Sequence, residues 1–153
     1  MRHRATVLLL LIALAGCGGG EDDAKDDAAS VLAGLYEGGE GPRRNQMCLI
    51  ERDGATRFGL IAWADSGNNS CTGKGRATRD GERLTLAMQG DEACVIEARI
   101  EGDAITLPPS LPEGCDYYCG PGVEMTGARF DRSGDSAENA RRAVDLTGDP
   151  LCS

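Results

Sequence analysis

The sequence predicts an all-β protein, a small antiparallel meander of about eight strands that closes into a barrel. Short segments alternate apolar and polar residues, as strands with one buried face do. Three of these segments begin at Cys48, Cys71 and Cys94, which are spaced 23 residues apart. Each segment leads to a tight-turn signal that is typical of hairpins. The signals are Asp53-Gly54, Asp80-Gly81 and Gly102-Asp103. The repeating unit is therefore a strand, a turn and a returning strand.

Alternation assigns an inward face to each segment. In 94–101 and 83–88 that face is apolar, and the opposite face is polar. In 71–79 the inward face holds a cysteine, two glycines and an alanine, which suits a tightly curved or closely crossed strand. The segment 57–63 has apolar residues on both faces, so we expect it to be covered on both sides.

Two weaker strands, near Leu35-Tyr36 and within Met125–Phe130, bring the count to about eight. A meander of that count closes well into a small barrel. An open, strongly twisted sheet or a small sandwich is the alternative. One short helix is predicted over Ser136–Leu146, with Ser136 as its N-cap. The barrel domain is thus expected over 31–131, followed by a tail with a short helix over 132–153.

The first 16 residues predict a secretory signal. A basic start, Met1–Arg4, precedes the short apolar run Val7–Leu14, and two small residues precede Cys17. The order Leu-Ala-Gly-Cys resembles the lipobox of bacterial lipoproteins. That resemblance implies cleavage before Cys17 and lipidation of this cysteine. A plain secretory signal, with Cys17 as a disulfide partner, is the alternative.

The segment that follows predicts an acidic tether, residues 17–30, on which the lipidated cysteine is the first residue. Its glycines and carboxylates cannot bury apolar surface, which is typical of a flexible spacer. A sorting signal is the other interpretation. Gly18 stands where lipoproteins retained in the inner membrane commonly carry aspartate. The resemblance therefore implies an outer-membrane protein of a Gram-negative cell that faces the periplasm.

Without Cys17 the chain has six cysteines, an even number that is typical of a disulfide framework in an oxidising compartment. If the strands alternate in direction, the cysteines that begin strands lie at one pole of the barrel, and the proline-rich loop after Leu107 returns there. We therefore expect disulfides at one pole, with the pairing left open. A thiolate metal site and a redox pair are alternatives that the spacing of Cys115 and Cys119 does not favour. The six cysteines are Cys48, Cys71, Cys94, Cys115, Cys119 and Cys152.

The most distinctive stretch is Gly114–Gly122, GCDYYCGPG. Its glycines and proline predict a compact loop that two cysteines would lock. Tyr117 and Tyr118 then have two interpretations: a rigid aromatic contact for a partner, or two rings that cover the disulfides and plug the barrel end. A third motif, Gly73-Lys74-Gly75, lacks the glycine spacing and the following Ser or Thr of a phosphate loop, and it lies in a predicted strand.

Charge and composition exclude several classes of function. The net charge is −9, and removal of 1–16, which hold two of the 16 basic and none of the 25 acidic residues, changes it to −11. This acidity argues against nucleic-acid binding. The only histidine, His3, lies in the removed part, which excludes Ser-His-Asp and Cys-His catalysis. No metal site and no cofactor are predicted.

These observations predict a non-enzymatic cell-envelope lipoprotein that is anchored to the membrane through Cys17 and binds a protein or an envelope component. Over 31–131 the predicted architecture is similar to that of the membrane-bound lysozyme inhibitors, which are small lipoprotein barrels, although no inhibitor motif matches residue by residue. That resemblance implies a cationic protein partner, which an acidic chain would attract. A carboxylate- or thiol-dependent enzyme is the second alternative. The sequence does not predict the oligomeric state.

Overall fold

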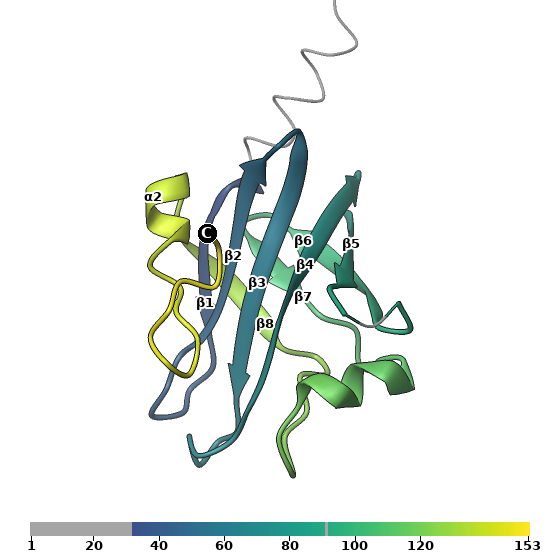
Figure 1. The fold of residues 1–153 in the computed structure, drawn as a ribbon, viewed down its shortest axis with the longest axis vertical. Helices are drawn as coiled ribbons and strands as arrows, with labels where there is room; N and C mark the ends of the chain where they lie inside the picture. Colours follow the sequence, from purple (N-terminus) through teal and green to yellow (C-terminus); the bar gives the residue numbers. More distant parts are fainter. Residues whose placement is uncertain (1–31, 91) are drawn as a thin grey trace, which may run out of the picture.

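A computed structural model describes residues 32–90 and 92–153 and shows a closed antiparallel barrel (Figure 1). The strands follow one another around the wall in chain order, and β8 pairs with β1. The predicted all-β barrel is confirmed, and the open-sheet alternative is wrong. The strands are β1 (Gly34–Gly38), β2 (Asn45–Arg52), β3 (Ala55–Trp63), β4 (Ser70–Asp80), β5 (Arg83–Met88), β6 (Val95–Glu101), β7 (Ala104–Thr106) and β8 (Arg129–Gly134). The signal segment, Cys17 and the tether lie outside the described residues.

All three predicted tight turns connect neighbouring strands. Gly54, Gly81 and Gly102 have φ angles of 69°, 61° and 62°, a left-handed conformation that glycine adopts without strain. The three turns lie at one end of the barrel, which we call the hairpin pole. β1 also begins at this end, because it runs antiparallel to β2 and its first residue pairs with Leu49. The other end is crossed by residues 107–128, the connection from β7 to β8, which we call the pole loop.

The interior is filled by the inward faces that the alternation predicts. Burial alternates strictly along β5 and β6, where Leu86 and Ile96 are fully buried. On β4 the small inward residues allow a close approach between strands. A Cβ atom on Gly75 would lie 2.0 Å from the carbonyl oxygen of Ala87. A closely crossed strand is therefore what the structure shows at this place.

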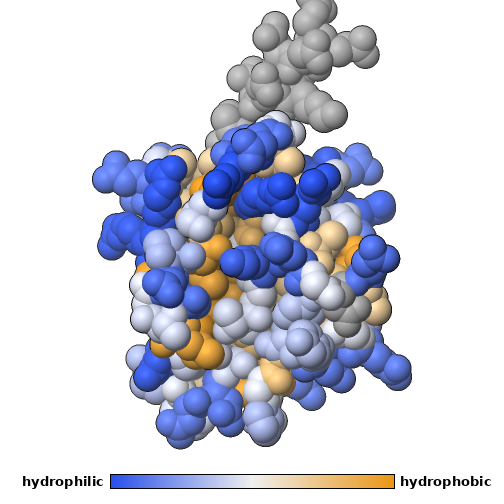
Figure 2. All heavy atoms as spheres, viewed as in Figure 1, coloured by the Kyte–Doolittle hydropathy of each residue, from blue (hydrophilic) through white to orange (hydrophobic). Residues whose placement is uncertain are grey.

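β3 is covered on both sides, as its sequence predicts. Phe58 and Leu60 face the interior, whereas Ile61 belongs to a second apolar cluster on the outer wall. That cluster is covered by the short helix α2 (Ala137–Ala140) and by residues 141–153, which we call the strap. Figure 1 shows α2 and the strap on the outside of the barrel, beside β1 and β2. An apolar strip is visible on this side in Figure 2.

The C-terminal helix is shorter than predicted. Ser136 caps it as expected, because its hydroxyl oxygen accepts a hydrogen bond from the Asn139 amide at 3.2 Å. The regular helix nevertheless ends at Ala140. The Asp145 carboxylate accepts hydrogen bonds from the backbone amides of Thr147 (2.8 Å) and Asp149 (3.0 Å). Such side-chain bonds offer the backbone an alternative to the helix.

The last strand begins later than predicted. Met125–Ala128 forms a turn, in which the Ala128 amide donates to the Met125 carbonyl at 3.2 Å and Gly127 has a φ of 66°. β8 therefore occupies 129–134, three residues beyond the predicted end of the barrel domain. In the described part of the chain, no helix is long and apolar enough to cross a bilayer.

The six predicted disulfide cysteines form three disulfides, but only two of these lie at one pole. Cys71–Cys119 and Cys94–Cys115 join the pole loop to the starts of β4 and β6. Cys48–Cys152 instead lies on the outer wall, where it ties the strap to the middle of β2. The prediction that Cys48 lies at this pole is wrong, because Met47 and Leu49 occupy the inward positions of β2 and Cys48 faces the strap on the outer wall.

Candidate partner-binding pole

The pole loop contains a short 3₁₀ helix, η1 (Glu113–Tyr118), which is the green helix at the lower right of Figure 1. Prolines precede it, and a proline cannot donate to a strand ladder, so the chain leaves the sheet here. The Cys115 amide donates to the carbonyl of Pro112 at 2.9 Å and starts the helical turn. Gly114 allows a close approach to the β5–β6 connection, since a Cβ atom there would lie 2.8 Å from that of Ala93.

Two disulfides hold η1 at both ends of the segment 116–118. Cys115 is bonded to Cys94 with a Cα–Cα distance of 4.7 Å, and Cys119 is bonded to Cys71 with a distance of 3.8 Å. Beyond Cys119 the Gly120 amide donates to the carbonyl of Ser70 at 2.9 Å. The residues between the two cysteines are therefore fixed to the barrel wall both covalently and by hydrogen bonds.

Tyr118 closes the barrel end. It is partly buried and packs against the interior cluster, and its hydroxyl donates to the carbonyl of Gln89 at 3.1 Å. The small residue beside the ring makes room for Met88, because a Cβ atom on Gly73 would lie 2.5 Å from Met88 Cε but at an ordinary contact distance of 3.4 Å from Tyr118 Cδ1. Tyr118 thus matches the interpretation in which a ring plugs the end of the barrel.

Tyr117 points into solvent and is 81% exposed. Its ring stands at 89° to that of Tyr118, with 5.4 Å between the centroids. An edge-to-face contact of this kind is favourable. Tyr118 therefore fits the interpretation of a ring that plugs the barrel end. Tyr117 does not, because its ring is exposed to solvent. Because its neighbour is anchored, Tyr117 is presented from a rigid base.

The surroundings of Tyr117 are acidic. The pole loop contains the exposed carboxylates of Glu113, Asp116 and Glu124, and no Lys or Arg occurs from 107 to 128. A shallow hollow of about 500 Å³ opens in this loop, lined by residues that include Asp116, Gly120 and Glu124. A cationic group on a partner protein would find two carboxylates at this hollow. The spacing of cysteines and tyrosines predicts the loop, but the shared position of Asp116 and Glu124 depends on how the loop turns.

Within the described part of the chain, Tyr36 and Asp145 have perturbed pKa values, and both lie away from this pole. Burial raises the pKa of Tyr36, whose hydroxyl donates to the carbonyl of Leu32 at 2.9 Å and accepts from Arg132 at 2.6 Å. Hydrogen bonds from Thr147 lower the pKa of Asp145 in the strap. Within 32–90 and 92–153, no group of three His, Cys, Asp or Glu side chains could hold a metal ion.

No protein-family model, no curated protein and no solved structure matches this chain. The fold and the candidate site are therefore known from the sequence and the structure of this chain alone. They describe a small, disulfide-linked β-barrel that presents one exposed tyrosine on an acidic loop.

Proposed function

We propose that this protein is a non-enzymatic lipoprotein of the bacterial cell envelope, anchored through Cys17, that binds a cationic protein with its pole loop. One observation carries the binding part of the proposal. Tyr117 is 81% exposed. The segment that carries it is held in place by two disulfides and by its neighbour Tyr118, which packs against the barrel interior. An exposed aromatic ring on a rigid base provides contact area with little loss of conformational entropy on binding.

The charge of the pole loop supports a cationic partner. Complementary charges at the rim of an interface accelerate association and select against partners of the wrong sign. With carboxylates and no basic residue in 107–128, the pole loop would repel acidic proteins and attract basic ones. The central contact would be the Tyr117 ring, and the carboxylates of Asp116 and Glu124 would surround it.

The proposed lipid anchor is a second argument for the pole loop as the binding surface. β1 begins at the hairpin pole, so the described part of the chain starts at the end opposite Tyr117. A lipid on Cys17 would then hold the hairpin pole nearer to the membrane and turn the pole loop towards the periplasm. The outer membrane is the location that the lipobox resemblance implies.

Site-specific photo-crosslinking in the native host tests the proposal. The full chain is made with a photoreactive phenylalanine at Tyr117 or, as a matched control, at Leu146, which is 62% exposed on the strap. We expect an adduct with a basic envelope protein from position 117 and none from position 146. The yield of the adduct should fall when the salt concentration is raised before illumination. Equal labelling from both positions, or an adduct that salt does not affect, would contradict the proposal.

A lysozyme is the sharpest candidate for the cationic partner, because the acidic pole loop suits a strongly basic protein. Binding of a purified c-type lysozyme to the full chain at low ionic strength, and its loss in Tyr117→Ala, is the expected result. A complex that forms equally well with Tyr117→Ala would place the contact elsewhere. If no complex forms, the lysozyme proposal is wrong, whereas the crosslinking experiment still decides whether the pole loop binds another basic protein.

A further inference from the structure

Three cations lie together on the outer wall of the barrel. They are Arg57 on β3 and Lys74 and Arg76 on β4. All three alternate with inward residues, so their side chains point away from the core. Arg57 and Arg76 are direct register partners, and Lys74 precedes Arg76 by two positions on the same face. Among the residues that the structure describes, none of the three makes an ion pair.

Like charges that face each other across two strands destabilise a sheet. A second arginine pair of the same kind shows how the barrel usually offsets this cost. Arg83 and Arg99 are also register partners, and Glu97 lies 3.8 Å from Arg83. Arg129 likewise has carboxylates beside it, at Glu101 and Asp131, at distances of 3.1 and 2.9 Å. The group on β3 and β4 differs from these, because no carboxylate in 32–90 or 92–153 forms an ion pair with any of its three members.

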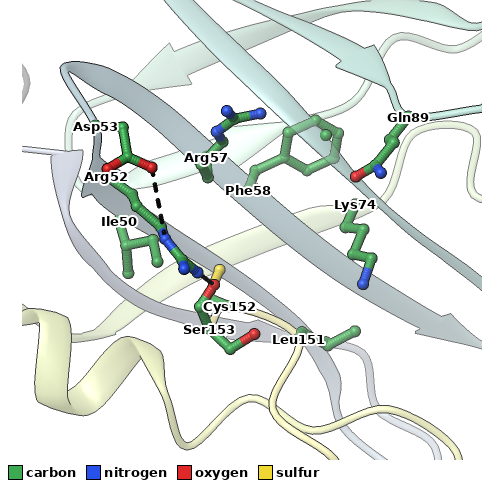
Figure 3. Close-up of a pocket in the computed structure, with 11 residues that line it drawn as sticks. Ile50, Arg52, Asp53, Arg57, Phe58, Lys74, Gln89, Leu151, Cys152 and Ser153 are labelled. Carbon is green, nitrogen blue, oxygen red and sulfur yellow. Dashed lines mark hydrogen bonds and ion pairs between the residues drawn. The ribbon is translucent and has the colours of Figure 1, made fainter.

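A groove of about 260 Å³ lies between the barrel wall and the end of the strap. Arg57 and Lys74 line it, as does Asp53, whereas Arg76 lies next to it as the register partner of Arg57. Figure 3 shows Arg57 and Phe58 on one side of the groove and the strap residues Leu151, Cys152 and Ser153 on the other. Lys74 flanks it at one end. At the opposite end Arg52 is engaged, since it lies 3.8 Å from Asp53 and donates to the carbonyl oxygen of Ser153.

We propose that this groove binds a phosphate group through Arg57, Lys74 and Arg76. Guanidinium groups bind phosphate oxygens in pairs, and an ammonium group adds a point charge. The bound anion would supply the negative charge that the sheet lacks between Arg57 and Arg76. The three side chains are long and reach solvent, so they can converge on one anion by rotamer changes. This site differs from a phosphate loop, because side chains on strands and not backbone amides provide the donors.

The phosphate could come from free phosphate or from the headgroup of a phospholipid. Titration of the ¹⁵N-labelled full chain, followed by NMR and calorimetry, distinguishes these sources. The probes are inorganic phosphate, glycerol 3-phosphate and glycerophosphoglycerol, which is the deacylated headgroup of phosphatidylglycerol. We expect saturable shifts of the Arg57 and Arg76 side-chain resonances and of the Gly59 and Gln89 amides. Tighter binding of either glycerol ester than of inorganic phosphate would identify a headgroup as the source, and the reverse order would identify free phosphate.

Charge-neutral variants test the assignment of the residues. Arg57→Gln and Arg76→Gln should each weaken binding of the best probe about tenfold or more, since a hydrogen bond to a charged group contributes about 1.5–3 kcal/mol. Arg83→Gln removes the same charge from the compensated pair and should leave the affinity unchanged. Shifts that do not saturate, or an equal loss in Arg83→Gln, would overturn the proposal. Circular dichroism of each variant shows whether the barrel is intact.

Discussion

Tyr36 shows how a single side chain at the seam of the barrel couples stability to pH. It faces the interior from β1 and is 1% exposed, and the Arg132 guanidinium lies 4.8 Å from the centre of its ring. Burial disfavours the phenolate, and this raises the pKa of Tyr36 above its ordinary value of 10.0. The unfolded chain therefore loses the phenolic proton at a lower pH than the folded chain.

The consequence is a specific loss of stability at alkaline pH. The contribution of Tyr36 is complete below pH 10 and decreases as the pH rises towards its folded-state pKa. Tyr36→Phe should lower the free energy of unfolding by about 1 kcal/mol at neutral pH, because one hydrogen-bonded hydroxyl is lost. It should also flatten the decline above pH 10. Urea unfolding at a series of pH values measures both effects, and Tyr117→Phe, at an exposed position, should retain the wild-type slope.

Gly59 is the residue that lets the strap lie flat on the barrel. It faces outward opposite Cys48, and a Cβ atom there would lie 2.8 Å from both the Cβ and the carbonyl oxygen of Leu151. Gly59→Val should therefore lift the strap and cost about 1–3 kcal/mol in unfolding free energy, as overpacking does. Thr78→Val introduces the same side chain at an exposed position of β4 and should have little effect. Wild-type stability in Gly59→Val would show that the strap does not depend on this contact.

The strap is the element that depends most on a covalent bond. Its apolar residues, including Ala143 and Leu151, pack on the outer cluster together with Trp63, which is the only tryptophan of the chain. Outside this cluster the strap has only a few hydrogen bonds to the barrel, such as that from the Val144 amide to Gln46 at 3.3 Å. Without the Cys48–Cys152 disulfide we expect the strap to open while the barrel remains closed.

The double variant Cys48→Ala/Cys152→Ala tests this expectation. Its Trp63 emission should shift to longer wavelength as the ring becomes hydrated. Hydrogen exchange should accelerate at the Leu151 amide, which donates to Ala143 at 2.9 Å, and should stay slow in β5 and β6. The matched variant Cys94→Ala/Cys115→Ala should instead loosen η1 and leave Trp63 unchanged. If exchange accelerates throughout the barrel in the first variant, the strap and the barrel form one cooperative unit.

The sequence predicts elements well where polarity alternates and less well where it does not. In β5 and β6 each polar residue marks the outer face, so strand, register and core follow directly. In β2 the run Met47–Ile50 is apolar on both faces, and the pattern alone could not show that Cys48 faces outward. The early end of α2 depends on the Asp145 carboxylate, whose competing hydrogen bonds become visible only once the loop is folded. The compact loop that carries Tyr117 could be predicted because glycine, proline and cysteine define it locally, whereas the role of Tyr117 in binding stays a prediction.

At the scale of the whole molecule, the two poles of the barrel differ. The acidic pole loop with Tyr117 lies at one end, and the hairpins, close to Arg52, lie at the other. Figure 2 shows hydrophilic residues along the upper rim of this face. From Cys17 to Leu32 a fully extended chain would span at most about 50 Å. A lipid anchor would therefore keep the barrel close to the membrane, with the hairpin pole nearer to it.

This orientation can be measured on the lipidated protein in vesicles. A genetically encoded fluorescent amino acid is placed at Tyr117 or at Glu82, which is exposed at the turn between β4 and β5. Quenchers attached to lipid headgroups should reduce emission from position 82 more than from position 117. Equal quenching would mean that the barrel tumbles freely on its anchor, and the reverse order would contradict the proposed orientation.

The three disulfides are nested, and this order would matter if the chain is exported from its N-terminus, as we propose. The pair that is closest in sequence, 21 residues apart, lies inside a pair 48 residues apart, and both lie inside the pair that is 104 residues apart. As the chain emerges, the innermost bridge is the first for which both sulfurs are present, and the outermost must wait for Cys152. A chain that stalls between Cys119 and Cys152 would therefore display one unpaired thiol at Cys48, a chemical mark that distinguishes incomplete molecules from finished ones.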